Sequence, residues 1–270
     1  MDKRNATLKI ALAQMTVTHG EVAPNLATIC RMTAEAAQAG AQIVCFPELA
    51  QCGFYMKKET LHALAEPIEG PFVTKLQALA AEHHIHLLCG YAEAPTGEEA
   101  LYNSCVLIDD EGKILENMRK IYLWGREKQR FTPGHRLPVV NTKLGRIGIL
   151  NCYDAEYPET FRIEALKGAE LILVGANWSF TGQSRWELQL SCNALCNLLF
   201  VAGVNIADQY CCGHSRVVAP DGRVIETVHN EETVLITTID FAEIEEQRAK
   251  IPYMTDFNPE TFTMDALKTY

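Results

Sequence analysis

The sequence has no long hydrophobic run, and this absence argues against a membrane-spanning helix. No stretch reaches the roughly 18 consecutive apolar residues that a helix needs to cross a bilayer. The charged residues at the N-terminus are not followed by an apolar segment of the signal-peptide type, and neither end carries a lipidation signal. We therefore expect a cytoplasmic protein that does not associate with membranes.

Positive charge is also scarce. The 270 residues contain 24 Lys and Arg against 34 Asp and Glu, which gives a formal net charge of −10. A nucleic-acid-binding surface needs clustered Lys and Arg to displace the counterions of the phosphates. The acidic balance therefore argues against a nucleic-acid partner, and we expect none.

Linkers rich in Gly, Ser or Pro are absent, and no internal repeat is visible. Hydrophobic residues make up 48% of the chain, and a chain of this length can bury roughly three quarters of its extended surface in one core. We expect one domain over residues 1–250. Residues 251–270 contain two prolines and little periodicity, so we expect a C-terminal tail that lies at a subunit interface.

The ten cysteines do not form a disulfide or metal pattern. Most lie inside apolar runs, as Cys45 and Cys89 do, and are interpreted as reduced, buried thiols. The histidines at 83–86 and the neighbouring Cys211 and Cys212 lack the two spaced ligand pairs of a structural zinc site, so we expect no metal. A role of Cys211 and Cys212 in sensing oxidation stays open, although adjacent cysteines seldom pair without strain.

The hydrophobic periodicity predicts an α/β fold. Strands are expected at residues 8–14, 42–46, 85–90, 171–174, 199–204 and 234–239, and helices at 25–39, 71–82, 158–167, 184–197 and 241–250. Antiparallel pairs are expected at 101–108 with 113–118, at 137–140 with 146–150, and at 215–219 with 223–227. Strands separated by helices, combined with hairpins, predict mixed sheets with helices outside.

Three segments place chemically active residues at the ends of predicted strands. In Phe46-Pro47-Glu48-Leu49, Glu48 lies between apolar residues. A poorly solvated carboxylate there would have a raised pKa suited to a general base. The alternative is a loop glutamate that points to water.

Lys120 and Cys152 follow the same pattern. Lys120 precedes Ile121-Tyr122-Leu123-Trp124 and is a candidate for stabilising an oxyanion, although a surface lysine is the commoner case. Cys152 ends an apolar strand just before a polar loop, where a thiol can act as a nucleophile beside a backbone N–H. A core cysteine is the alternative, since the chain has nine others.

These residues stand in sequence blocks whose order is informative. The blocks are Phe46-Pro47-Glu48-Leu49, Arg119-Lys120-Ile121-Tyr122-Leu123-Trp124, Phe131-Thr132-Pro133-Gly134, Asn151-Cys152-Tyr153-Asp154-Ala155-Glu156-Tyr157-Pro158-Glu159, Arg185-Trp186-Glu187 and Gly213-His214-Ser215-Arg216 with Pro220-Asp221-Gly222. In this order, from about residue 8 to residue 240, the sequence resembles the nitrilase superfamily of carbon–nitrogen hydrolases, in its amidase-like branch.

The resemblance implies a fold and a set of roles. The fold is a four-layer αββα sandwich of two mixed sheets with helices outside. Glu48 corresponds to the general base, Lys120 to the oxyanion stabiliser and Cys152 to the nucleophile, with Glu127 as the second glutamate and the Tyr153 backbone N–H at the oxyanion. The implied enzyme is a thiol amidohydrolase that forms a thioester from a small amide and needs no metal or organic cofactor.

The resemblance also bears on assembly and on alternatives. Members usually pair through the helices after the nucleophile, here residues 158–167 and 184–197, so we expect a homodimer or a higher homo-oligomer. A nitrilase or an N-carbamoyl amine hydrolase with the same triad remains open. So does a non-catalytic or redox-sensing protein on this fold.

Four positions bear on the substrate. Nitrilases proper usually have Trp-Glu after the nucleophile, whereas Tyr153-Asp154 is similar to the amide-cleaving branches. Glu156 stands where omega-amidase-like members often have an arginine, which favours a small neutral or cationic amide. Phe54 replaces a tyrosine that is common in the family, so we expect one hydroxyl fewer near the substrate.

Trp178 is the other candidate for substrate binding. It follows the predicted strand end Val174-Gly175-Ala176-Asn177, so it is a candidate wall of the pocket. A core tryptophan is the equally weighted alternative.

Overall fold

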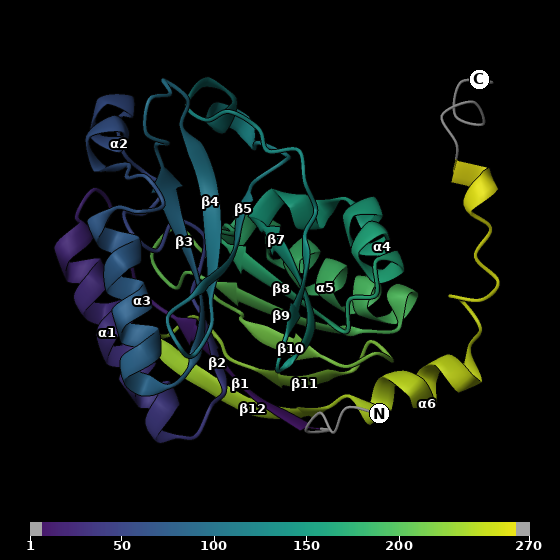
Figure 1. Ribbon diagram of the computed structural model, residues 1–270. Helices are drawn as coiled ribbons and strands as arrows, with labels where there is room; N and C mark the ends of the chain where they lie inside the picture. Colours follow the sequence, from purple (N-terminus) through teal and green to yellow (C-terminus); the bar gives the residue numbers. More distant parts are fainter. Residues whose placement is uncertain (1–6, 263–270) are drawn as a thin grey trace.

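The computed structural model describes residues 7–262, whose strands form two six-stranded mixed sheets (Figure 1). The first sheet has the order β12-β1-β2-β3-β4-β5. Its three central strands, β1, β2 and β3, are parallel, and the others pair antiparallel. The bounds are β12 (Thr233–Asp240), β1 (Thr7–Gln14), β2 (Ile43–Cys45), β3 (His86–Glu93), β4 (Tyr102–Ile108) and β5 (Ile114–Arg119).

The second sheet repeats this plan, with the order β11-β10-β9-β8-β7-β6. Its parallel strands are β7, β8 and β9, and antiparallel strands flank them on both sides. The bounds are β11 (Val224–Thr227), β10 (Arg216–Val218), β9 (Phe200–Asn205), β8 (Leu171–Ala176), β7 (Gly145–Asn151) and β6 (Val139–Thr142).

Helices cover the outer face of each sheet (Figure 1). Helices α1 (Val22–Gln38) and α3 (Pro71–His83) pack on the first sheet, and α4 (Pro158–Leu166) and α5 (Gln183–Asn197) pack on the second. The remaining helices are α2 (Lys58–Leu64), α6 (Ala242–Lys250) and the short 3₁₀ segments η1 (Gly125–Gln129), η2 (Cys152–Glu156), η3 (Phe180–Gly182) and η4 (Pro259–Phe262). The predicted four-layer α/β sandwich is confirmed.

Strand β1 shows how the sequence produces these layers. Alternate side chains of a strand point to opposite faces. Ile10 and Leu12 contact the core between the two sheets, together with Leu173 and Phe200 of the second sheet. The smaller Ala11 and Ala13 belong to the core under α1 and α3. Because β1 is buried on both faces, its sequence is mostly apolar on both sets of alternate positions, and only Lys9 and Gln14 interrupt the run.

The structure differs from the sequence-based expectation at a few elements. Helix α2 was not expected, because Leu61 is its single buried residue and no apolar periodicity is visible. Strand β3 continues past Gly90 to Glu93, since its last residues are buried as well. Strand β6 begins at Val139 rather than at residue 137.

Helix α6 follows β12 and contacts the core between the sheets through the buried Ile244. Figure 1 shows residues 251–262 continuing beyond α6 on the side of the second sheet, where Met254 contacts Arg162 of α4. The expected boundary at residue 250 coincides with the end of α6, and residues 263–270 of the expected tail lie outside the described residues. Its place at a subunit interface stays a prediction.

Within residues 7–262, no helix combines the length and the apolar character that crossing a bilayer would require.

Candidate active site

Three polar side chains meet where strands of both sheets end. Glu48 follows β2 and Lys120 follows β5, both in the first sheet, whereas Cys152 follows β7 in the second. Together with Glu127 of η1 they line one cavity of about 180 Å³. The structure thus brings together the three segments that the sequence singled out.

Lys120 is buried between two carboxylates. Its Nζ lies 2.6 Å from Glu48 Oε1 and 2.8 Å from Glu127 Oε2. Burial alone would lower the pKa of Lys120, but the two carboxylates outweigh it and hold that pKa well above the ordinary value. The site therefore contains a permanent ammonium.

Asn103 of β4 orients both carboxylates. Its Nδ2 donates to Glu48 Oε1 at 2.7 Å and to Glu127 Oε1 at 2.8 Å, and its Oδ1 accepts from Asn151 Nδ2 at 3.0 Å. Sequence reasoning missed Asn103. The available signal was the polar pair Asn103-Ser104 inside a mostly apolar predicted strand, since buried polar side chains need buried partners.

Glu48 has the properties of a base that can take a thiol proton. Lys120 and Asn103 both bind Oε1, whereas Oε2 is buried without a strong partner among residues 7–262. The Cys152 thiol approaches the same carboxyl group. Burial raises the pKa of Glu48, Lys120 opposes that rise and Glu127 adds to it.

Cys152 lies at the sharp junction between β7 and η2. Its φ of 50° is in the left-handed region, which is uncommon for a residue with a side chain and frequent at functional sites. The backbone N–H of Asn177 acts to lower the pKa of the Cys152 thiol. Burial and the Glu48 charge raise the pKa of Cys152 well above the ordinary value, so the resting form is the thiol and Glu48 must remove its proton.

Asp154 connects the segment after Lys120 to the turn that carries Cys152. Its carboxylate accepts backbone N–H groups from Ile121 at 3.1 Å, Tyr122 at 2.7 Å and Asn151 at 3.3 Å. Burial raises the pKa of Asp154 to about 7, although these N–H groups oppose the rise. Sequence reasoning used Asp154 as a marker of the family branch and did not find this structural role.

Aromatic side chains form the outer wall of the cavity. Phe54 and Trp178 line it, as do Tyr55, Trp124 and Tyr153. The Trp178 indole N–H donates to the Gly182 carbonyl at 2.8 Å, which fixes the ring. The expectation of one hydroxyl fewer at position 54 stays a prediction, and the next residue, Tyr55, also lines the cavity.

An ion pair lies in the same outer part of the cavity. Arg185 Nη2 is 3.2 Å from Glu156 Oε1, and both residues line the cavity. The side chain of Glu156 is 19% exposed and that of Arg185 is 51% exposed. Arg185 can therefore move into water more easily than Glu156 can.

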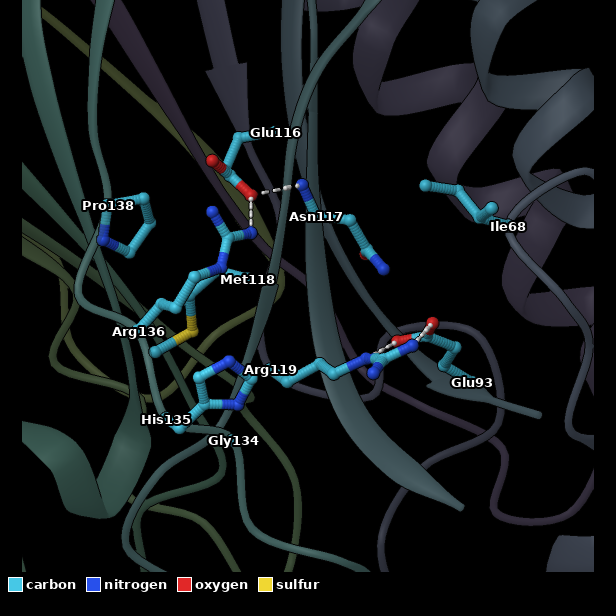
Figure 2. Close-up of a pocket in the computed structure, with 10 residues that line it drawn as sticks. All are labelled: Ile68, Glu93, Glu116, Asn117, Met118, Arg119, Gly134, His135, Arg136 and Pro138. Atoms are coloured by element: carbon cyan, nitrogen blue, oxygen red, sulfur yellow. Dashed lines mark hydrogen bonds and ion pairs between the residues drawn. The ribbon is translucent and has the colours of Figure 1, made fainter. Parts of the chain in front are cut away.

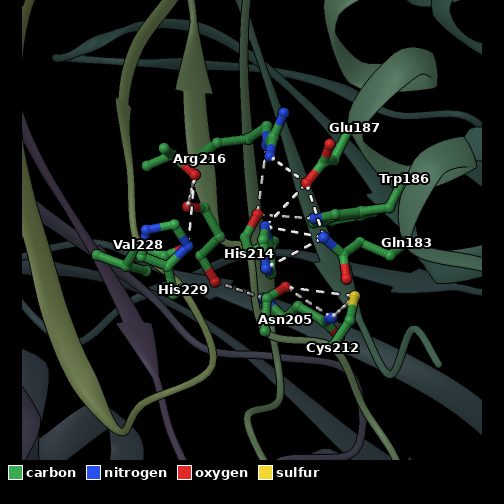
Figure 3. Close-up of polar contacts among 12 residues, drawn as sticks. Gln183, Trp186, Glu187, Asn205, Cys212, His214, Arg216, Val228 and His229 are labelled. Atoms are coloured by element: carbon green, nitrogen blue, oxygen red, sulfur yellow. Dashed lines mark hydrogen bonds and ion pairs between the residues drawn. The ribbon is translucent and has the colours of Figure 1, made fainter. Parts of the chain in front are cut away.

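A polar cluster behind this wall holds the start of α5 in place (Figure 3). Trp186 donates its indole N–H to the His214 carbonyl at 2.9 Å. Its ring packs against the Trp178 ring, with 5.2 Å between the ring centroids. Glu187 Oε1 lies 2.8 Å from His214 Nδ1 and 2.9 Å from Arg216 Nη2. These contacts fix α5 and thereby the positions of Trp178 and Arg185.

A second hollow, of about 260 Å³, lies away from the triad, beside β5 and residues 134–138 (Figure 2). Glu93 pairs with Arg119 there at 2.6 Å, and Glu116 pairs with Arg136 at 2.8 Å. The acids and arginines of this hollow neutralise each other in pairs.

Cys211 and Cys212, whose role in sensing oxidation stays open, do not line the cavity of the triad. Cys211 and Cys212 are both buried free thiols, and Cys211 Sγ contacts Asn177 Oδ1 at 2.7 Å. Among residues 7–262, no group of three or more His, Cys, Asp or Glu side chains could hold a metal ion.

Comparison with known proteins identifies relatives over nearly the whole chain. The family model for carbon–nitrogen hydrolases matches residues 9–249. Omega-amidase NIT2 of Xenopus tropicalis is 31% identical, and the alignment covers 97% of this chain and 99% of that protein. A Pseudomonas protegens protein named "hydrolase in pqqF 5′ region" is 33% identical over 95% of this chain and 91% of its own.

Solved structures show the same architecture. A variant of the amidase from Nesterenkonia sp. AN1, with the acetamide moiety of fluoroacetamide covalently added at its active-site cysteine, superposes with a TM-score of 0.81. It is 26% identical and covers 94% of this chain and 95% of its own. A carbon–nitrogen hydrolase from Helicobacter pylori gives a TM-score of 0.90 at 23% identity, over 98% of this chain and 99% of its own, and shows the shared fold.

Proposed function

Because the chain belongs to the carbon–nitrogen hydrolase family and is a hydrolase of carbon–nitrogen bonds other than peptide bonds, we propose that it cleaves a small amide through a thioester on Cys152. The products are a carboxylate and ammonia. The observation that carries the proposal is the buried Lys120 ammonium, 2.6 Å and 2.8 Å from two carboxylates, in the cavity that also contains Cys152.

Acylation begins with the transfer of the thiol proton to Glu48. The Cys152 sulfur attacks the amide carbonyl carbon, and a C–S bond forms while the carbonyl electrons move to the oxygen. Lys120 and the backbone N–H of Tyr153 stabilise this oxyanion. A buried ammonium is effective here because few waters screen it.

Collapse of the tetrahedral intermediate breaks the C–N bond. Glu48 returns its proton to the nitrogen, ammonia leaves, and the acyl group remains on Cys152 as a thioester. Glu48 then takes a proton from a water molecule that attacks the thioester carbon. The C–S bond breaks, the carboxylic acid leaves, and the proton returns to the Cys152 sulfur. Glu127 keeps Lys120 in place throughout.

The cavity restricts the substrate to a small molecule. Its volume of about 180 Å³ lies below the usual size of sites for drug-like ligands. Its lining combines the buried triad with aromatic walls. A short amide with a compact distal group fits this space, and we propose such a molecule as the substrate.

Ammonia release tests the proposal. Purified protein would be incubated with a panel of short amides, nitriles and N-carbamoyl amines, and Cys152→Ala would serve as the inactive variant. Cys192→Ala is the matched control, because Cys192 is an exposed thiol on α5 and does not line the cavity. We expect ammonia from amides, lost in Cys152→Ala and retained in Cys192→Ala, with an acylated Cys152 in the mass spectrum.

Other outcomes of this panel would contradict the proposal. Turnover of nitriles or N-carbamoyl amines without turnover of amides would show that the proposed substrate class is wrong, whereas the assignment of the triad would stand. Full activity of Cys152→Ala would show that Cys152 is not the nucleophile. Silence of the whole panel, with no alkylation of Cys152 by iodoacetamide, would favour a protein that has no hydrolytic function.

A further inference from the structure

We propose that the end of the substrate remote from the amide is a primary ammonium that binds Glu156 in place of Arg185. The substrate class is then the ω-amino amides, in which an alkyl chain joins an amide to an ammonium. This inference rests on the proposed amide hydrolysis and adds the chemistry of the remote group.

The charges along the cavity favour a cation at its outer end. The charged residue types that line it are three acids, Glu48, Glu127 and Glu156, and two bases, Lys120 and Arg185, so the acids exceed the bases by one. Lys120 is bound to the two inner carboxylates. Glu156 is therefore the acid that a second cation can reach, and Arg185 occupies it in the free protein.

The Glu156–Arg185 pair can open at little cost. Water screens an ion pair with an exposed partner, and such pairs contribute little to stability. Arg185 is half exposed and can keep its hydration after it leaves Glu156. Glu156 belongs to η2, directly after the turn of Cys152, and it is mostly covered. A substrate ammonium can thus replace the guanidinium without leaving a buried charge unpaired.

The aromatic walls support the same class of ligand. Phe54, Tyr55, Trp124, Tyr153 and Trp178 all line the cavity. The faces of such rings are negative and attract a cation, most strongly when it is partly desolvated. A compact ammonium also needs less room than a planar guanidinium, so it fits a cavity of about 180 Å³.

A substrate with a remote carboxylate meets the opposite environment. It would have to reach Arg185 beside Glu156 and in front of the same ring faces, with a cavity balance that is already negative. The like charges would repel it. Arg185 therefore acts as a replaceable occupant of Glu156 and not as an anchor for an anion.

The test compares three amides that share one chain length and differ in the remote group. The remote groups are an ammonium, a methyl group of similar size, and a carboxylate, and the comparison is repeated over several chain lengths. Since a charge-assisted contact replaces a neutral one, kcat/KM for the ammonium compound should exceed that for the methyl compound by about tenfold to hundredfold. The difference should appear in KM.

Variants of the ion pair give two opposite expectations. Glu156→Gln should bring the ammonium-to-methyl ratio close to one. Arg185→Ala should lower KM for the ammonium compound, because it removes the competing cation. Each ratio is measured on one protein sample, so a loss of folded enzyme cancels. Glu82→Gln, an exposed position on α3, is the matched control and should leave the ratio unchanged.

Calorimetric binding of the three compounds to Cys152→Ala gives the same comparison without turnover. Equal binding of the ammonium and methyl compounds would overturn the inference. So would a preference for the carboxylate compound that disappears in Arg185→Ala. Hydrolysis of the methyl compound without an ammonium preference would overturn this inference alone, whereas a complete lack of hydrolysis would overturn the proposed function.

Discussion

Lys120 organises the site at the scale of single residues. It is buried, and it holds Glu48 and Glu127 within 2.8 Å of its ammonium. A buried carboxylate pair without this cation would have to take up protons, since like charges that are close together cannot both ionise at neutral pH. The lysine therefore keeps Glu48 available as a base in addition to its proposed contact with the oxyanion.

The acid limb of the pH profile should report Glu48. Its pKa is raised by burial, so kcat/KM should begin to fall at a pH above the ordinary glutamate value of about 4.3. The pKa of Lys120 is held above its ordinary value of about 10.4, so Lys120 should cause no loss below that pH. Initial rates measured from acidic to alkaline pH test both expectations, the one for Glu48 and the one for Lys120. An unchanged kcat/KM down to about pH 4 would contradict the assignment of Glu48 as the base.

Glu164 of α4 is a second buried acid, outside the active site. Its Oε1 accepts the Ile149 N–H at 3.2 Å, and Oε2 has no partner among residues 7–262. Burial raises the pKa of Glu164 well above the ordinary value. Its contribution to stability is therefore fully present below the unfolded pKa of about 4.3 and is lost as pH rises through the folded pKa.

Glu164→Gln should remove this pH dependence. We expect its free energy of unfolding to exceed that of the wild type by about 1 kcal/mol or more at neutral pH, because one pKa unit corresponds to roughly 1.4 kcal/mol. The difference should shrink toward about pH 4. Urea unfolding at both pH values measures it, with the exposed Glu159→Gln of the same helix as the control. Equal changes in the free energy of unfolding of the two variants would contradict the prediction that Glu164 is buried in its neutral form.

Sequence reasoning located Glu48, Lys120 and Cys152 because each breaks an apolar pattern at a predicted strand end. Asn103 escaped it, and Arg185 was recognised as part of a family block but not as a residue of the site, for physical reasons. Asn103 acts through partners that are up to 55 residues away in the chain, and Arg185 lines the cavity because α5 turns its first residues toward it. Such contacts depend on how the two sheets pack, which no local spacing encodes.

At the scale of elements, Asp154 links the end of β5 to the end of β7. Two of its three backbone donors follow Lys120, and the third precedes Cys152. The distance between the ammonium and the thiol therefore depends on this carboxylate. No local pattern predicts the link, because β5 and β7 belong to different sheets.

At a pH above the Asp154 pKa of about 7, Asp154→Asn should lower kcat by about tenfold to hundredfold, since charge-assisted hydrogen bonds worth about 1.5–3 kcal/mol are replaced by weaker ones. KM should change little, because Asp154 does not line the cavity. Steady-state kinetics on the preferred amide separates the two constants. Asp221→Asn, in an exposed turn after β10, is the control. A rise in KM with an unchanged kcat would mean that Asp154 acts on the substrate and not on the spacing of the triad.

At the scale of the whole molecule, the outer helices of the second sheet expose apolar side chains. Ile163 and Leu166 of α4 and Leu188 of α5 are all exposed, Leu188 to 68%. Exposed apolar patches that span neighbouring elements mark interaction surfaces. A second copy of the chain would cover this face in the homodimer that we propose.

Leu188→Glu should therefore shift the protein toward the monomer. Introducing a charge at the centre of an apolar interface leaves it desolvated and unpaired, which costs several kcal/mol. Sedimentation velocity at micromolar concentration distinguishes the two states. Val224→Glu, an exposed apolar position on β11, is the control and should keep the assembly of the wild type. A wild-type protein that sediments as a monomer would end the proposal.

Because the triad is divided between the two sheets, the rate of turnover depends on how the two sheets pack against each other. Glu48 and Lys120 move with one sheet and Cys152 with the other. The apolar layer between the two sheets, which includes Phe200, sets the distance between the Glu48 carboxylate and the Cys152 sulfur. A smaller side chain in this layer can thus abolish activity while every strand and helix remains formed. The catalytic rate is therefore more sensitive to core packing than the secondary-structure content is.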